Sequence, residues 1–245
     1  MIASLGMYDM PHLQGAHDRL WAGIRTALGH GPETLTRGDD LWRVWQAPDL
    51  LLAQTCGLPY RARLHGHVAL IGTPDYGLPD CPPGHYFSYL IRRRDDTRGL
   101  KALCNQGVMA FNEPLSQSGW AAPVTHLTAR NLAPRRMRQT GAHLASLNAV
   151  AAGDADFAAI DALTLLLAAQ HDIDTTAAVT PFDRTAPTPA LPYITARTLD
   201  PAPLAHAMRA AIARLSPTDR SALRLKGLVN MPASAYLALP IPPDP

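Results

Sequence analysis

Apolar and polar residues alternate along the chain with the two periods typical of strands and helices. Short apolar runs bounded by glycine, proline or charged residues predict strands at 2–7, 50–55, 67–72, 85–92 and 108–111. Residues 14–28 instead carry Leu20, Ile24 and Leu28 at the spacing of one helix face. Because strand-like and helix-like segments alternate, the pattern predicts an α/β fold.

The second half of the chain continues this alternation. The sequence predicts helices at 141–151, 162–172 and 203–215, and strands at 155–161 and 192–196. A last helix is expected after Ser216 and Pro217, which have the residue types of an N-cap and a first helical position. Residues 183–191 are rich in proline and interrupt the pattern, and the proline-rich end PIPPDP gives no reason to fold.

Composition and charge exclude several classes of protein. The chain has 245 residues, 47% of them apolar, which is enough for one large domain or two lobes with a sizeable core. A net charge of +2 without a dense Lys/Arg face argues against nucleic-acid binding. No apolar stretch is long enough to span a membrane. The first residues lack the charged and apolar regions of a signal peptide, which favours a soluble cytoplasmic protein.

Cysteine and histidine spacing gives no metal motif. The three cysteines form neither a C-x-x-C pair nor a zinc pattern, and Cys56 and Cys81 flank one predicted strand, so their pairing is left open. His65 and His67 would share one face of a strand, but no third ligand follows at a suitable spacing. The sequence therefore predicts no metal and no cofactor.

The stretch NEPLSQSGW at 112–120 is the main candidate for chemistry. Ser116 is a good helix N-cap, Ser118 adds a second hydroxyl, and Gly119 allows close approach to the backbone. The unpaired amides of a helix N-terminus attract an anion, and small hydroxyl residues would let a phosphate reach them. The same residues also suit a simple helix cap without a ligand, and the residues alone leave both interpretations open.

A nucleophilic triad of Ser118, His143 and Asp161 is disfavoured by spacing. The nucleophile elbow of α/β-hydrolases is G-x-S-x-G, whereas Ser116 and Trp120 occupy the two glycine positions around Ser118. His143 lies in the first turn of a second predicted helix, where it is either a structural residue or a second ligand at the same site.

Several segments together resemble a known family. They are ASLGMYD, QTCGLPY, LIGTPDY, GHYFSYLIRR, FNEPLSQSG, TGAHLASLNAVAAGDADFAAIDALT and TPALPYITA, in that order over about residues 1–200. The chain resembles the PhnD-like family, the phosphate/phosphonate substrate-binding proteins of ABC transporters. The resemblance implies a type II periplasmic-binding-protein fold, with two α/β lobes and a ligand cleft between them. Lobe one would comprise 1–88 plus 185–245, and lobe two 89–184.

The resemblance also implies the ligand-binding residues, namely Tyr8, Tyr60, Ser116, Gln117, Ser118, Gly119, His143 and Asp161. The Ser-x-Ser-Gly loop and His143 would hold the anion, the two tyrosines would line the cleft from lobe one, and Asp161 would face a cationic group of the ligand. Aminoalkylphosphonate binders carry a second acid in the segment that returns to lobe one. Here that segment contains Leu191, Pro192 and Tyr193, so another small anion is at least as compatible.

The resulting hypothesis is non-catalytic binding of a small phosphate- or phosphonate-like anion, with an ABC transporter permease as the implied partner and a periplasmic location. The absence of a signal-peptide pattern favours the cytoplasm instead, and the two locations stay open. An enzyme on the same fold that uses His143 and Asp161 as acid and base is the alternative, together with a cytoplasmic sensor.

Overall fold

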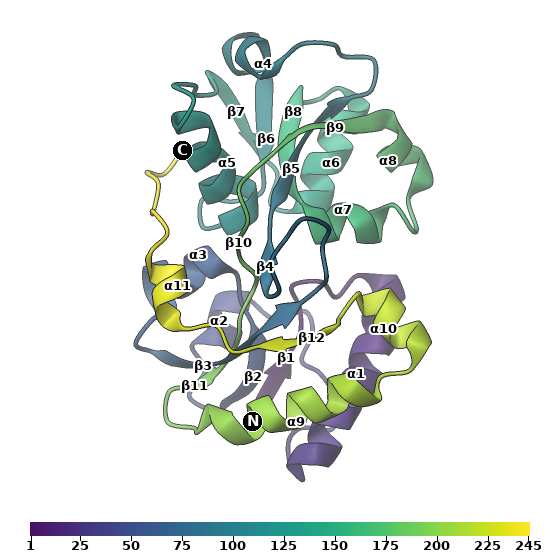
Figure 1. Cartoon of the computed structure of the whole chain (residues 1–245), viewed down its shortest axis with the longest axis vertical. Helices are drawn as coiled ribbons and strands as arrows, with labels where there is room; N and C mark the ends of the chain where they lie inside the picture. The colour runs from purple at the N-terminus through teal and green to yellow at the C-terminus, as the bar shows by residue number, and fades with distance from the viewer. The chain divides into compact units, whose positions relative to one another are not determined.

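The computed structural model describes residues 1–245 and contains two compact units, shown in Figure 1. Unit 1 consists of Met1–His85 and Pro189–Ala238, and unit 2 of Tyr86–Thr188 and Leu239–Pro245. The division expected from the sequence has its boundaries a few residues away and places 239–245 in lobe one, whereas these residues pack with unit 2.

Unit 1 is built around one five-stranded sheet. Its order is β1 (Ile2–Ser4), β2 (Leu50–Gln54), β11 (Tyr193–Ala196), β3 (Val68–Asp75) and β12 (Gly227–Val229). β1 is parallel to β2, and β11 is antiparallel to both β2 and β3. β1, β2 and β3 therefore run in the same direction, and the loops that follow them leave from one edge of the sheet.

The helices of unit 1 include the three that the sequence predicts, near residues 14–28 and 203–215 and after Pro217. The full set is α1 (Gln14–Leu28), α2 (Leu41–Trp45), α3 (Gly57–Pro59), α9 (Pro201–Arg214), α10 (Pro217–Leu223) and α11 (Ala233–Leu237), with short turns η1 (Pro11–Leu13) and η2 (Tyr60–Leu64). α1 lies along α9 (Figure 1), with Leu20 and Ile24 buried. A Cβ on Gly23 would lie 3.3 Å from the Ala211 Cβ, so glycine permits this close approach. Ser216 caps α10 by accepting from the Asp219 amide at 3.0 Å, as predicted.

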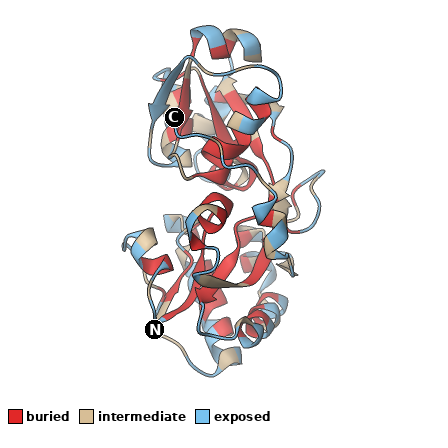
Figure 2. Ribbon diagram, turned by 90° about the vertical axis from the view of Figure 1, so that its left-hand side faces the viewer, coloured by how far each residue is buried: buried red, intermediate tan, exposed pale blue.

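Unit 2 contains a second five-stranded sheet. Its order is β7 (Arg136–Gln139), β6 (Val108–Phe111), β8 (Phe157–Asp161), β5 (Ser88–Arg93) and β9 (Val179–Arg184). β6 is parallel to β7 and β8, whereas β5 is antiparallel to β8 and β9. Figure 2 shows the central strands as buried, which agrees with the fully buried side chains of Met109 and Phe157.

Short helices and a small ribbon complete unit 2. The helices are α4 (Leu100–Gln106), η3 (Gln117–Ala121), α5 (Ala122–Thr128), α6 (His143–Ala152), α7 (Ala162–Ala168) and α8 (Ile173–Ala178). β4 (His85–Tyr86) and β10 (Thr188–Pro189) form a two-stranded sheet from the segments where the chain passes between the units. None of the helices is both long and apolar enough to cross a membrane.

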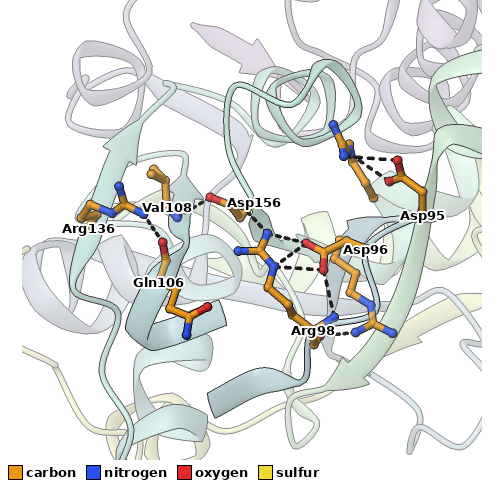
Figure 3. Close-up of polar contacts among 9 residues, drawn as sticks. Asp95, Asp96, Arg98, Gln106, Val108, Arg136 and Asp156 are labelled. Carbon is orange, nitrogen blue, oxygen red and sulfur yellow. Dashed lines mark hydrogen bonds and ion pairs between the residues drawn. The ribbon is translucent and has the colours of Figure 1, made fainter. Parts of the chain in front are cut away.

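An ion cluster fixes the edge of this sheet where β6 begins (Figure 3). Arg98 donates to Asp96 and to Asp156, and Asp156 accepts from the Val108 amide at 2.7 Å. The cluster thus joins the loop after β5 to the start of β6. Because its members bind one another and the backbone, the cluster has a structural role at this edge.

Two strands differ from the sequence-based prediction. The first strand ends at Ser4, earlier than expected. The strand β7 is absent from the sequence-based prediction, because its RMRQ residues are all exposed and carry no apolar signal. The C-terminal segment 239–245 has no regular structure but packs with unit 2. The open question of Cys56 and Cys81 is also answered, since no disulfide joins them.

Candidate functional site

Three loops of unit 2 leave from the same edge of its sheet. Because β6, β7 and β8 are parallel, their C-terminal ends meet there, and open α/β sheets bind ligands at such an edge. β6 is followed by the Asn112–Gly119 segment, β7 by the turn into α6, and β8 ends at Asp161. β5 begins at this edge with Ser88, paired in register with Asp161.

The Ser-x-Ser-Gly stretch forms the start of a helix. Ser116 is the N-cap of η3, and its Oγ accepts from the Gly119 amide at 2.9 Å. Ser116, Gln117 and Ser118 are all buried. The interpretation of Ser116 as a helix cap is therefore confirmed. Its hydroxyl group accepts one hydrogen bond and still has a hydrogen to donate to a ligand.

The two helix starts come into direct contact through Ser118 and His143. Ser118 Oγ and His143 Nε2 share a hydrogen bond of 2.7 Å. The carbonyl of Ser118 accepts from Ser88 Oγ at 2.8 Å, which ties η3 to the start of β5. The contact between Ser118 and His143 joins residues that are 25 positions apart in the sequence and places a hydroxyl and an imidazole side by side.

The surroundings keep His143 neutral. Burial in the protein lowers the pKa of His143 below its ordinary value of 6.5, while the charge of Asp161 and the Ala159 carbonyl oppose this shift less strongly. Its Nδ1 makes no hydrogen bond of normal geometry. Burial thus favours the neutral form of His143, whose Nε2 shares a hydrogen bond with Ser118.

We expect the stability of the protein to decrease at acidic pH because of His143. The unfolded chain takes up this proton near pH 6.5, whereas the folded protein resists it to lower pH, so stability decreases as pH falls below about 6.5. The melting temperature of the wild type should drop more steeply from pH 7.5 to 5 than that of His143→Gln. His30→Gln, at an exposed position, should follow the wild type. Parallel curves for the wild type and His143→Gln would contradict the assignment.

Asp161 is a helix cap as well as a strand end. Its Oδ1 accepts from the amides of Leu163 and Thr164 at 2.8 and 3.2 Å, and its Oδ2 accepts from Thr164 Oγ1 at 2.7 Å. The side chain is almost fully buried. The sequence IDALT has an N-cap residue type between an apolar strand and an apolar helix, so this role was readable from the sequence.

The same bonds argue against a catalytic triad. Ser118 and His143 are paired as a nucleophile and a base would be, but a triad also needs the acid bonded to the far nitrogen of the imidazole. Asp161 instead gives both oxygens to α7, and His143 Nδ1 does not bond to it. Ser118 and His143 therefore form a hydroxyl–imidazole pair without the third member of a triad.

Gly119 lies directly against the side chain of Asn112. A Cβ at position 119 would lie 1.9 Å from Asn112 Oδ1, which is far inside van der Waals contact. Asn112 Oδ1 is buried and accepts no hydrogen bond. Sequence reasoning found Gly119 and considered Asn112 as an N-cap type, but it did not predict the contact between them.

The two tyrosines predicted for lobe one lie in different surroundings of unit 1. Tyr8 follows β1, and its ring meets that of Tyr76 edge-on at 5.6 Å; Gln54 Nε2 donates to the Tyr76 hydroxyl at 2.8 Å. Tyr60 instead packs in the core, with its ring 5.3 Å from that of Tyr236. Gln54 ends β2 and Tyr76 follows β3, so these neighbours of Tyr8 come from the ends of two further strands.

Solved structures with the same fold support a class assignment. A binding component of an ABC phosphonate transporter from Pseudomonas aeruginosa matches with a TM-score of 0.74 and 13% identity over 97% of this chain and 82% of its own. PhnD1 from Prochlorococcus marinus, solved with methylphosphonate, gives 0.75 and 15% over 96% and 93%. The chloride-bound XAC2383 from Xanthomonas citri gives 0.67 and 14% over 96% and 92%. The fold is therefore that of type II periplasmic binding proteins, as predicted.

A family model narrows this class. Residues 49–233 match the family described as ABC transporter, phosphonate, periplasmic substrate-binding protein. The chain belongs to this family, which confirms the resemblance seen in the sequence. It is a substrate-binding component of the phosphonate ABC transporter type and not an enzyme, so the alternative with His143 and Asp161 as acid and base is set aside. A search of curated proteins gave no match.

Proposed function

We propose that the protein binds a small phosphonate- or phosphate-like anion at the edge of the unit 2 sheet where β6, β7 and β8 end. The contact residues in this proposal are Ser116, Gln117, Ser118, Gly119 and His143. The observation that carries it is the 2.7 Å hydrogen bond between Ser118 Oγ and His143 Nε2, because it brings the starts of η3 and α6 to one place. The structure of PhnD1 from Prochlorococcus marinus with methylphosphonate adds support for the ligand class.

The anion would be held by amide and hydroxyl donors together with His143. Hydrogen bonds to an ionised phosphonate are about twice as strong as neutral ones, and the helix starts add a favourable dipole. A bound dianion would also raise the pKa of His143 again, because a nearby negative charge favours the imidazolium. Binding of the dianion should therefore be accompanied by proton uptake at His143.

The roles of the remaining predicted residues stay open to test. The position of Tyr8 at the edge where β1 ends supports a role in contact with ligand. Tyr60 is engaged in core packing against Tyr236, so a ligand contact from it would add to a structural role. The expected position of the ligand between the two lobes stays a prediction. The family implies a small ligand and a permease as partners.

The first test is calorimetric titration of the purified protein with methylphosphonate, 2-aminoethylphosphonate, inorganic phosphate and sulfate. Binding of at least one phosphonate or phosphate at micromolar concentration, with sulfate weaker, is the expected result. Absence of heat and of any thermal shift with all four at millimolar concentration would overturn the proposal and leave Ser116 as a helix cap only.

Asp161→Asn distinguishes between charged and uncharged ligand substituents. Because both carboxylate oxygens of Asp161 cap α7, we expect no strong bond from this residue to a ligand ammonium. Removing its negative charge should tighten methylphosphonate binding by about two- to fivefold. Binding of 2-aminoethylphosphonate should gain by a similar factor.

The measurement is the ratio of the two dissociation constants in wild type and variant. Asn is itself a good N-cap, so the helix should remain intact, and a melting curve serves as the control. If only the aminophosphonate becomes weaker, by tenfold or more, Asp161 binds the ammonium and the expectation is wrong.

A further inference from the structure

The C-terminal segment 239–245, LPIPPDP, contacts the helix that carries the proposed anion site. Trp120 Nε1 donates to the carbonyl oxygen of Pro243 at 3.1 Å. The segment packs with unit 2, although residues 233–237 just before it, helix α11, belong to unit 1. Neither the family match, which ends at residue 233, nor the proposed function assigns a role to this segment.

Trp120 connects this segment to the residues of the proposed anion site. It lies in η3 directly after Gly119, and its side chain is 4% exposed. Its ring packs against that of Phe111, the last residue of β6, with 5.1 Å between centroids. Trp120 belongs to the same five-residue π-helix as Ser118 and Gly119, so the packing of its ring restrains their backbone.

The chemistry of the segment suits a fixed docked conformation. Prolines restrict the free chain to extended conformations, so little entropy is lost when it docks. A tryptophan N–H that donates to a carbonyl of a proline-rich strand is the contact by which aromatic grooves recognise such segments in other proteins. The side chains of 239–245 are exposed or half-buried, so removing them opens no cavity in the core.

We propose that segment 239–245 positions the anion-binding turn through the Trp120–Pro243 hydrogen bond, so that its removal weakens anion binding without unfolding the protein. This inference rests on the proposed function, because the turn that it positions is the proposed site. Trp120 is here a positioning residue and does not touch the ligand.

The test is a double-mutant cycle of the truncation after Ala238 and Trp120→Phe, with inorganic phosphate and methylphosphonate as probes. Each change alone should weaken the better-bound probe by about five- to tenfold, the factor expected for one hydrogen bond. The double variant should be no weaker than either single variant, because both remove the same contact. Trp42→Phe, at a half-buried position in unit 1, is the matched control and should bind as the wild type does.

Fluorescence and melting curves complete the design. Truncation should shift the tryptophan emission to longer wavelength, and this shift should disappear in the Trp120→Phe background. A fall in melting temperature with an unchanged dissociation constant would show a merely structural role and overturn the inference. So would additive losses in the double variant. If the wild type binds neither probe, both the proposed function and this inference fail. If the wild type and the truncated protein bind equally well, the proposed function stands and only this inference fails.

Discussion

Ser118→Ala should weaken binding of the preferred phosphonate by about 10- to 100-fold in calorimetric titration. The substitution removes the hydroxyl that would donate to the anion and also the 2.7 Å bond that orients His143. Losing a hydrogen bond to a charged group costs roughly 1–3 kcal/mol, and the loss falls on the complex more than on the free protein. The melting temperature should also fall, because the buried imidazole of His143 loses its hydrogen-bond partner, so binding is titrated well below that temperature.

Serine caps elsewhere in the chain supply the control. Ser216→Ala removes an N-cap in unit 1 and should lower stability by about 1 kcal/mol while phosphonate affinity stays as in the wild type. Ser116→Ala should lower both the stability and the phosphonate affinity, because this residue caps η3 and also lies in the proposed site. Equal affinity of Ser118→Ala and wild type would remove Ser118 from the site.

Gly119→Ala is expected to abolish measurable phosphonate binding and to destabilise unit 2. The new Cβ would lie 1.9 Å from Asn112 Oδ1, so either Asn112 or the turn that carries Ser118 must move. Steric insertion of this kind typically costs about 1–3 kcal/mol of stability. A displacement of about an ångström at the donors is enough to break a short hydrogen bond to a ligand.

Two further variants separate the clash with Asn112 from a general effect of replacing glycine by alanine. Gly227→Ala is the matched control, because a Cβ added there would have nothing within 4 Å and the backbone is not left-handed. The double variant Asn112→Gly/Gly119→Ala removes the atoms in the way and should recover most of the melting temperature. If Gly119→Ala binds and melts like the wild type, the turn is not constrained as described.

Residues with a strong local signal were predicted correctly from the sequence. Leu20 and Ile24 mark the buried face of α1, Ser216 marks the start of α10, and the apolar residues of β8 mark a buried strand. These signals depend only on neighbours in the sequence. The overall class followed from their alternation, and the family from motifs such as FNEPLSQSG.

The features that depend on distant neighbours could not be predicted. β7 forms because its backbone pairs with β6, although its side chains are polar and exposed. The clash that requires Gly119 depends on Asn112, and the order of the C-terminal segment depends on a bond to Trp120. Such contacts arise only when the sheet brings its strand ends together.

The place of β11 in unit 1 has a consequence for how the chain folds. This strand lies between β2 and β3, so the sheet of unit 1 lacks its central member until residues 193–196 have been synthesised. The sheet of unit 2 is complete by residue 184. On a ribosome, unit 2 can therefore fold while β1, β2 and β3 still have unpaired edges. Slow codons or mutations that delay β11 should thus expose unit 1 to aggregation and leave unit 2 native.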